Sequence, residues 1–378
     1  LLVFVLVILL SSCVPASAPA TFKIGLVAPF SGRDAALGYN MLAAAKLALK
    51  EWNERGGVGG YYIELVAQDD HNEGEAAAVQ AWKMALDPQL LGVVGHPSSE
   101  SARAGASVYL AAHLPAIVLS DARLGAVLGE SYVFLLGPYE EALARTASRF
   151  AASQGTKRLA LLSGSIPPGT GQQVPPGGRM ANMVGEEARL YGIEIAYGGV
   201  FSYVPGFEKE LAEQLKEARP DLIFYGGDYL EGGDLLVSLR ANGLNTPVLG
   251  GPAMANPDLL KIAGPAAEGI FYLSPDLHPR EVAGALGFVE VYRRLAGTDP
   301  WPQALLTYDA VNTMLEGLER SYKDGKPPGR QVLGHALASE QFQGLTGPIS
   351  FGENGLVPEA NGYIYRIEGM IWPGRLVK

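Results

Sequence analysis

Short apolar runs rich in β-forming residues alternate with helical stretches along this chain, and the alternation limits the fold more than any other feature. The first series of runs comprises FKIGLVAPF, YYIELVAQD, LLGVVG, AIVLS and YVFLLG, and its helical stretches include MLAAAKLALKEWNERGG and AAAVQAWKMAL. Such alternation is typical of parallel strands, because each parallel connection needs a crossover that is usually a helix. We therefore expect an α/β fold.

A second series of runs follows the first. It comprises RLALLSG, IEIAYGGVF, DLIFYGG, PVLGG and GIFYLSP, with the helical stretches GFEKELAEQLKEARP and GDLLVSLRANGL between them. Two consecutive series predict two Rossmann-like α/β lobes, each with a mostly parallel sheet. The C-terminal part departs from this pattern, because two long amphipathic helices precede GPISFGENG and GYIYRIEG, which we expect to pair as closing antiparallel strands.

The N-terminal run LLVFVLVILLSSC is too short and ends too abruptly for an ordinary membrane span. It is typical of a secretion signal, which we place at residues 1–12. Its last four residues, LSSC, resemble the lipobox of bacterial lipoproteins, in which the signal is cut before the cysteine and the thiol receives lipid. We therefore expect lipid attachment at Cys13 and a tether over residues 13–21. An ordinary signal peptide with an incidental cysteine remains the alternative.

Charge and composition exclude several classes of function. The formal net charge is −10 and no Lys/Arg-rich block occurs, which excludes a nucleic-acid partner. Cys13 is the only cysteine, so an internal disulfide is impossible. The sequence contains no nucleophile elbow, zinc-protease motif, P-loop or paired CxxC, and its five histidines have no ligand-like spacing. We predict no catalytic residue, no metal and no cofactor.

One long stretch rich in proline and glycine, Ser165 to Gly178, is a loop by composition. It contains GTGQQV, which resembles part of a dinucleotide fingerprint. However, Val174 stands where a third glycine is needed, and Pro175 and Pro176 follow it. Two consecutive prolines prevent the start of a phosphate-binding helix, so we reject a nucleotide site here.

Polar residues follow the ends of several predicted strands. These are Ser31, Asp69, Asp70, His96 to Ser99, Ser120 to Arg123, and Asp228 to Glu231. Ligands bind at the carboxyl ends of strands in open parallel sheets, so two facing lobes predict a cleft between them. Plainer roles remain open, because Ser98 and Ser99 also suit helix N-caps and Asp121 can pair with Arg123 on the surface. An enzyme would have to combine Ser99, His96 and Asp70, and nothing in the sequence links them.

Seven stretches from Phe22 onward resemble the type I periplasmic solute-binding proteins of the branched-chain amino acid (Leu/Ile/Val) family, which deliver ligands to ABC importers. The stretches are KIGLVAPFSG with Gly38, NERGGVGG followed by IELVAQDD, GVVGHPSSESA, PDLIFYGG, AEGIF, TYDA and TGPISFGENG. The resemblance implies two lobes that are joined by three crossover strands and close on ligand by hinge motion. It implies discontinuous lobes: an N-terminal lobe of residues 22–138 plus 276–358 and a C-terminal lobe of residues 139–275 plus 359–378.

The resemblance also implies binding residues in the first lobe. The family's serine that receives the ligand α-carboxylate falls on Ser99, beside Ser98, where an apolar strand gives way to a helix N-terminus. The next contact loop of the family falls on Asp121, Ala122 and Arg123. This is a departure, because the family usually has small residues and a threonine there.

In the second lobe the family's tyrosine falls on Asp228, with Tyr229 beside it. The glutamate that commonly pairs with the ligand ammonium falls on Pro252, so the expected ammonium partner is missing. For an amino-acid ligand, Asp121 or Asp228 would then have to supply the acid.

The predicted function is that of an extracytoplasmic solute-binding lipoprotein of an ABC importer, with a branched-chain amino acid as its ligand. The alternatives are a ligand such as an amide, a urea-like compound or a small carboxylate, or the role of a ligand-sensing receptor domain. The predicted partners are the small-molecule ligand, the permease subunits and a lipid anchor. We expect a monomer, secreted across the cytoplasmic membrane and anchored by lipid in the periplasm or at the cell surface.

Overall fold

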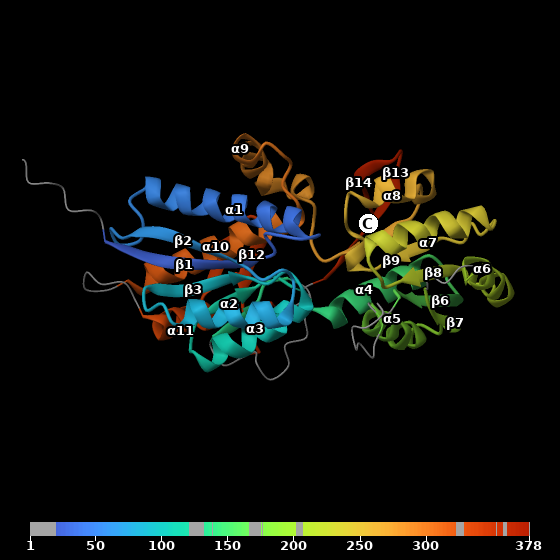
Figure 1. The fold of residues 1–378 in the computed structure, drawn as a ribbon, viewed down its shortest axis with the longest axis horizontal. Coiled ribbons are helices and arrows are strands. Elements are labelled where there is room, and N and C mark those ends of the chain that lie inside the picture. The colour runs from blue at the N-terminus through green and yellow to red at the C-terminus, as the bar shows by residue number, and fades with distance from the viewer. Residues whose placement is uncertain are drawn as a thin grey trace, which may run out of the picture.

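The computed structural model describes residues 20–120, 132–137, 139–165, 175, 177–201, 207–322, 329–352, 354–357 and 361–377, which form two α/β lobes lying side by side (Figure 1). The sheet of the first lobe is parallel, with the strand order β2-β1-β3-β4-β5. Its strands are β1 Thr21–Ala28, β2 Tyr62–Asp69, β3 Leu90–Gly95, β4 Ala116–Val118 and β5 Val133–Leu135. β1 thus begins at the last residue of the expected tether.

The sheet of the second lobe has the order β14-β13-β10-β9-β8-β6-β7. Its strands are β6 Arg158–Ser163, β7 Glu194–Val200, β8 Leu222–Tyr225, β9 Val248–Gly250, β10 Phe271–Ser274, β13 Tyr363–Glu368 and β14 Ile371–Val377. The segment β7-β6-β8-β9-β10 is parallel and repeats the doubly wound order of the first lobe. The predicted fold class, two Rossmann-like lobes with mostly parallel sheets, is confirmed.

Helices cover both sheets. In the first lobe they are α1 Ala35–Glu54, α2 Gly74–Ala85, α3 Ser99–Ala111, α9 Leu286–Ala296, α10 Pro302–Ser321 and α11 Arg330–Ser339. In the second lobe they are α4 Glu140–Ser153, α5 Gly178–Leu190, α6 Phe207–Ala218, α7 Tyr229–Ala241 and α8 Leu259–Ala263. Among the residues that the structure describes, no helix is both long and apolar enough to span a bilayer.

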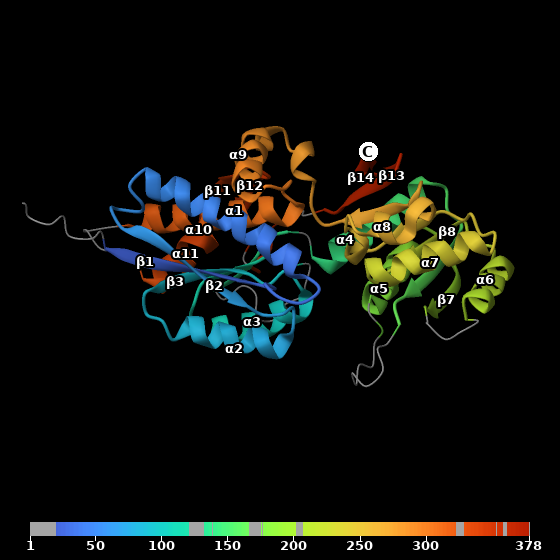
Figure 2. The same ribbon diagram turned by 45° about the horizontal axis from the view of Figure 1, so that its top comes forward.

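The chain passes between the lobes three times. It leaves the first lobe between β5 and α4 and returns after β10. It crosses again between Leu356, which still bridges Leu135 of β5, and β13. Figures 1 and 2 both show α10 beside α1, although the two helices are far apart in sequence. Trp52 of α1 donates its Nε1–H to Asn312 of α10 at 2.8 Å, and Met314 and Leu315 share a core with Ile24 of β1. The C-terminal helices therefore complete the first lobe.

The expected pairing of GPISFGENG with GYIYRIEG is wrong. The first segment contains β12 Gly347–Ser350, which pairs with β11 Gln341–Gly344, whereas β13 pairs with β14 and β10. Both hairpins have two-residue turns, and in the β13–β14 turn Gly369 and Met370 have φ values of 63° and 56°. Such tight turns match the twist of a hairpin and close at little entropic cost, so the local pairings prevail over a distant one.

Candidate functional site

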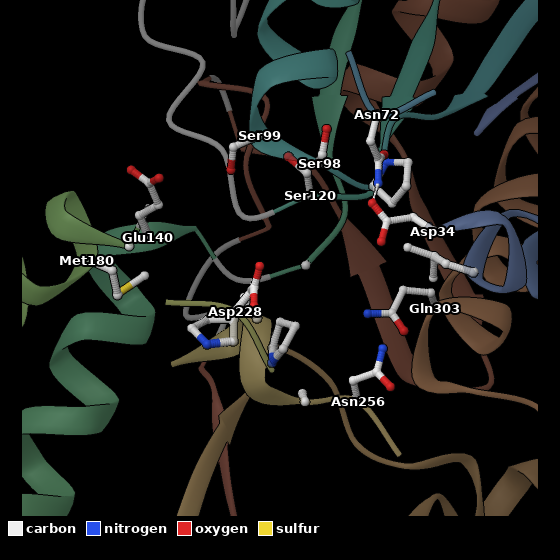
Figure 3. A pocket seen from close by; sticks show the side chains of 18 of the residues that line it. Asp34, Asn72, Ser98, Ser99, Ser120, Glu140, Met180, Asp228, Asn256 and Gln303 are labelled. Carbon is white, nitrogen blue, oxygen red and sulfur yellow. Dashed lines mark hydrogen bonds between the residues drawn. The ribbon is translucent and has the colours of Figure 1, made fainter. Parts of the chain in front are cut away.

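A cleft of about 930 Å³ lies where the carboxyl ends of the two sheets face each other. Its walls are formed by residues that follow β1, β3 and β4 in the first lobe and β8 and β9 in the second. In each sheet the strand order reverses between β1 and β3, or between β6 and β8, and such a reversal is where doubly wound sheets bind ligands. Figure 3 shows Ser98, Ser99 and Ser120 on one side of this cleft and Asp228 and Asn256 on the opposite side.

Ser98 and Ser99 stand at the N-terminus of α3, as the sequence predicted. Ser98 is the N-cap, and its hydroxyl accepts a hydrogen bond from the backbone N–H of Ser101 at 3.3 Å. Ser99 is the first residue of the helix, and both serines line the cleft. The first-turn N–H groups and the helix dipole favour an anion at this end of α3. Capping and anion binding are therefore compatible at this position.

Asp228 lines the opposite wall and caps α7. Its Oδ1 accepts from the backbone N–H groups of Leu230 at 2.9 Å and Glu231 at 3.1 Å. Its Oδ2 accepts from Arg33 Nη1 of the first lobe at 3.3 Å. Each oxygen of this carboxylate thus already has a partner, and the second partner crosses the cleft. Arg33 would therefore compete with a ligand cation for this carboxylate.

Tyr229 and Pro252, which the sequence resemblance implied as ligand contacts, also line the cleft. Tyr229 is half-buried, and burial is the main cause that raises the pKa of its hydroxyl. The hydroxyl is therefore protonated at neutral pH and can donate. Pro252 begins the short 3₁₀ helix η2 Pro252–Met254 and offers no acid. Asp258 is also part of this wall, and it pairs with Lys261 at 2.6 Å.

Several cleft residues were not identified from the sequence, although most of them carry polar side chains. Arg33 and Asp34 come two and three residues after Ser31, which was the predicted polar residue at the end of β1. Asn72 follows β2, and its Nδ2 donates to Asp34 Oδ2 at 2.8 Å (Figure 3). Its Oδ1 is buried and has no hydrogen-bond partner among the described residues. Extending each polar run past the strand end would have found all three residues.

Four of the predicted residues lie outside the described residues. They are Cys13, Asp121, Ala122 and Arg123. Ser120, which directly precedes the predicted contact loop, is buried and lines the cleft.

The enzyme alternative is not supported by the positions of His96 and Asp70. Both side chains are fully buried, and neither lines the cleft. His96 Nδ1 lies 2.9 Å from Asp70 Oδ2, and its Nε2 lies 2.7 Å from the Tyr109 hydroxyl. Both ring nitrogens are therefore engaged away from Ser99, so His96 is not placed to take a proton from it. The described part of the chain also holds no group of three or more potential metal ligands.

Comparisons with known proteins agree with this architecture. The chain is 26% identical over 341 residues to the leucine-, isoleucine-, valine-, threonine- and alanine-binding protein of Pseudomonas aeruginosa, and the match covers 89% of this chain and 87% of the relative. An ABC transporter substrate-binding protein of Desulfitobacterium hafniense in complex with Leu superposes with a TM-score of 0.75 at 25% identity, covering 94% of this chain and 99% of that chain. A solute-binding protein of Rhodopseudomonas palustris in complex with 3,4-dihydroxybenzoic acid shares the fold, with a TM-score of 0.74 at 24% identity and coverage of 94% and 95%.

The family assignment rests on nearly the whole described chain. The profile of the periplasmic binding protein family matches residues 21–370, which include both lobes and all three passages between them. The resemblance inferred from the seven sequence stretches is thus confirmed, as is the prediction that the chain is not an enzyme, since the relatives are binding proteins. The chain belongs to the periplasmic binding protein family.

Proposed function

We propose that this protein binds a branched-chain amino acid such as leucine between its lobes and delivers it to an ABC importer. The observation that carries the proposal is the opposition of two helix N-termini across the cleft: α3 with Ser98 and Ser99 in one lobe, and α7 with Asp228 in the other. The first suits an anion, and the second adds a carboxylate. The names of the relatives, among them a leucine-specific-binding protein of Salmonella typhimurium, support an amino acid.

The ligand carboxylate is assigned to the N-terminus of α3. There the donors would be the Ser99 hydroxyl and the first-turn N–H groups other than that of Ser101, which Ser98 caps. Arg123 and its neighbours Asp121 and Ala122 remain proposed contacts from the sequence. The helix N-terminus is a rigid element, which suits a group that must orient the ligand.

The ligand ammonium is assigned to two acceptors on facing walls, Asn72 of the first lobe and Asp228 of the second. Asn72 Oδ1 is an acceptor without a partner among the described residues, and Asp228 Oδ2 becomes available when Arg33 moves. The proposed contacts Tyr229 and Pro252 line the same wall as Asp228. This pair of acceptors takes the place of the acid that is missing at Pro252.

Closure of the lobes would bring the two walls together and exclude water. We propose that the lobes move as units with the boundaries expected from the resemblance, residues 22–138 plus 276–358 against residues 139–275 plus 359–378. The Arg33–Asp228 pair spans them, and both side chains are partly exposed, so its stabilising effect is small. A weak bridge suits a protein that must open to load its ligand.

The cellular setting follows from the same reasoning. We propose secretion outside the cytoplasmic membrane, lipid attachment through Cys13 and docking of a monomer on permease subunits. The family is periplasmic, which supports the extracytoplasmic location.

A small carboxylate that is not an amino acid is the second candidate ligand. Pro252 provides no acid for an ammonium group, and Arg33 provides a guanidinium. The Rhodopseudomonas palustris protein with 3,4-dihydroxybenzoic acid indicates that this fold also accommodates an aromatic carboxylate. A titration with 3,4-dihydroxybenzoate separates the two candidates.

The direct test is a titration of the purified protein with L-leucine by calorimetry, accompanied by thermal unfolding and small-angle scattering. Leucine at a hundred times its Kd should stabilise the folded protein by about 2.7 kcal/mol, because it binds only the folded state. The radius of gyration should fall on binding. Binding of 3,4-dihydroxybenzoate but not of leucine would replace the first candidate with the second, and an unchanged radius with bound leucine would refute closure.

The substitution Arg33→Gln tests the ammonium assignment. It removes the partner of Asp228 Oδ2, so the affinity for leucine should rise up to about fivefold at low ionic strength, and the gain should shrink in 1 M salt. Arg179→Gln is the matched control, since Arg179 also lines the cleft but lies 3.7 Å from Glu140 within the second lobe. A weaker affinity in Arg33→Gln alone would mean that Arg33 itself contacts the ligand and that Asp228 does not accept its ammonium.

A further inference from the structure

A continuous chain of hydrogen bonds lies beneath the α3 end of the cleft. It joins three fully buried side chains: Tyr109 of α3, His96 after β3 and Asp70 after β2. The Tyr109 hydroxyl lies 2.7 Å from His96 Nε2, and His96 Nδ1 lies 2.9 Å from Asp70 Oδ2. Burial and the negative charge of Asp70 raise the pKa of Tyr109, so the tyrosine remains protonated and can donate to Nε2.

The backbone at His96 adopts a conformation that needs such support. His96 has a φ of 57°, in the left-handed region that side chains rarely adopt, and Gly95 before it has a φ of 153°. The backbone N–H of His96 donates to the carbonyl of Val27 in β1 at 2.8 Å. A Cβ at Gly105 of α3 would lie only 2.4 Å from His96 Nε2, so the helix leaves room for the ring only because this residue is glycine. The imidazole of His96, through its two hydrogen bonds and its packing against α3, thus stabilises the sharp turn that ends β3.

Two members of this chain, His96 and Asp70, connect directly to residues of the cleft. His96 is two residues before Ser98 and three before Ser99, so its turn sets where α3 begins. Asp70 Oδ1 accepts from the backbone N–H of Asn72 at 3.0 Å, and Asn72 lines the cleft. The carboxylate therefore links the loop after β2 to the loop after β3.

We propose that Tyr109, His96 and Asp70 are positioning residues of the binding site, holding the N-terminus of α3 and the loop of Asn72 in one fixed relation. They do not touch the ligand, and they act through Ser98, Ser99 and Asn72. Groups that receive a ligand must be held within about 0.5 Å by their supporting shell, which makes affinity sensitive to this chain. The effect on leucine affinity rests on the proposed function, whereas the effect on the loops does not.

The test compares Tyr109→Phe with Tyr272→Phe. Each substitution deletes one hydroxyl from a fully buried tyrosine, and Tyr272 donates at 2.7 Å to the carbonyl of Pro373, which does not line the cleft. Two properties are measured in both variants: amide hydrogen exchange of residues 96–104 without ligand, and the Kd for L-leucine. Thermal midpoints measure the general loss of stability.

Both variants should lower the thermal midpoint to a similar extent. Only Tyr109→Phe should speed exchange in residues 96–104, by about tenfold or more, and raise the Kd for leucine by about tenfold. His96→Asn should also speed exchange and raise the Kd, since asparagine tolerates the positive φ and can donate to Asp70 but cannot reach Tyr109.

Equal exchange and equal Kd in the two tyrosine variants would overturn the proposal and leave a merely structural role. Faster exchange without a change of Kd would also overturn it, because the loops would then move without consequence for the ligand. If the unmodified protein binds no leucine, the proposed function fails separately. The exchange experiment then decides whether Tyr109, His96 and Asp70 hold the two loops, and the titrations are repeated with 3,4-dihydroxybenzoate to test the effect on affinity.

Discussion

Replacement of Ser99 by aspartate is expected to raise the Kd for L-leucine by at least about a hundredfold without lowering the stability of the protein. A carboxylate in the first turn of α3 interacts favourably with the helix dipole, so the fold should tolerate it. The same carboxylate would face the carboxylate of the ligand, and like charges placed together at an interface cost several kcal/mol. Calorimetry and thermal unfolding measure the two effects separately.

Two control variants define the cause of this loss. Ser99→Ala removes the hydroxyl but leaves the first-turn N–H groups, so its Kd should rise by about tenfold at most. Ser107→Asp adds the same charge to an exposed position of the same helix, outside the cleft, and should leave the Kd within about twofold. Undiminished leucine binding by Ser99→Asp would show that no carboxylate binds at the N-terminus of α3, and the orientation proposed for the ligand would be wrong.

The sequence predicts the central strands of the sheets well because these strands are buried on both faces. The runs LLGVVG and LIFY are apolar throughout, and glycine or polar residues follow them, so their positions are clear without any knowledge of the fold. The same reasoning locates Ser98, Ser99 and Asp228, since a polar residue after a parallel strand lies at the ligand-binding edge.

Periodicity predicts less where turns or contacts between distant residues decide which elements pair. Local hairpin turns, rather than the apolar pattern, determine the partners of β12 and β13. The pairing of Arg33 with Asp228 joins residues that are 195 positions apart and belong to different lobes. The return of α10 to the first lobe was inferred from family resemblance, because amphipathicity shows that a helix is half-buried but does not identify its partner.

His96 illustrates a different limit. From the sequence, a histidine after a strand and next to two serines is a candidate catalyst as well as a packing residue. The structure resolves this through burial and two hydrogen bonds, to Asp70 and Tyr109, whose separations of 26 and 13 residues carry no recognisable spacing. The positive φ of His96 is also invisible in the sequence, because asparagine and glycine are the usual residues in that conformation.

A fall in stability of about 2 kcal/mol between pH 7 and pH 5 is expected from His278 alone. This histidine lies where the chain returns from β10 to the first lobe, and only 7% of its surface is exposed. Burial, with a smaller contribution from Arg280, lowers its pKa from 6.5 to about 4. As the pH falls below 6.5 the unfolded chain gains a proton that the folded chain does not, so folding becomes less favourable until the pH approaches 4.

Urea unfolding of the unliganded protein at pH 7 and pH 5 measures this loss, and His278→Asn should abolish most of it. Asparagine keeps an acceptor for the backbone N–H of Arg280, which His278 Nδ1 accepts at 3.4 Å, and it does not titrate. His335→Asn is the matched control, because His335 is exposed on α11 and its removal should leave the pH dependence unchanged.

The pH window itself distinguishes His278 from the acidic groups whose pKa values are lowered in the fold. The carboxyls of Asp69, Asp87 and Asp299 have lowered pKa values. Burial alone would raise the pKa of Asp69, but hydrogen bonds from the backbone of Phe30 and His71 and from Ser31 outweigh it. Hydrogen bonds from Lys23 to Asp87 and from Arg293 to Asp299 are the main causes for the other two. Their contribution to stability is present above their ordinary pKa of 3.8 and is lost only as the pH falls below it. Between pH 7 and pH 5 these groups therefore do not change the stability. Parallel curves of unfolding free energy against pH for the unmodified protein and His278→Asn in that range would mean that His278 is not held neutral in the fold.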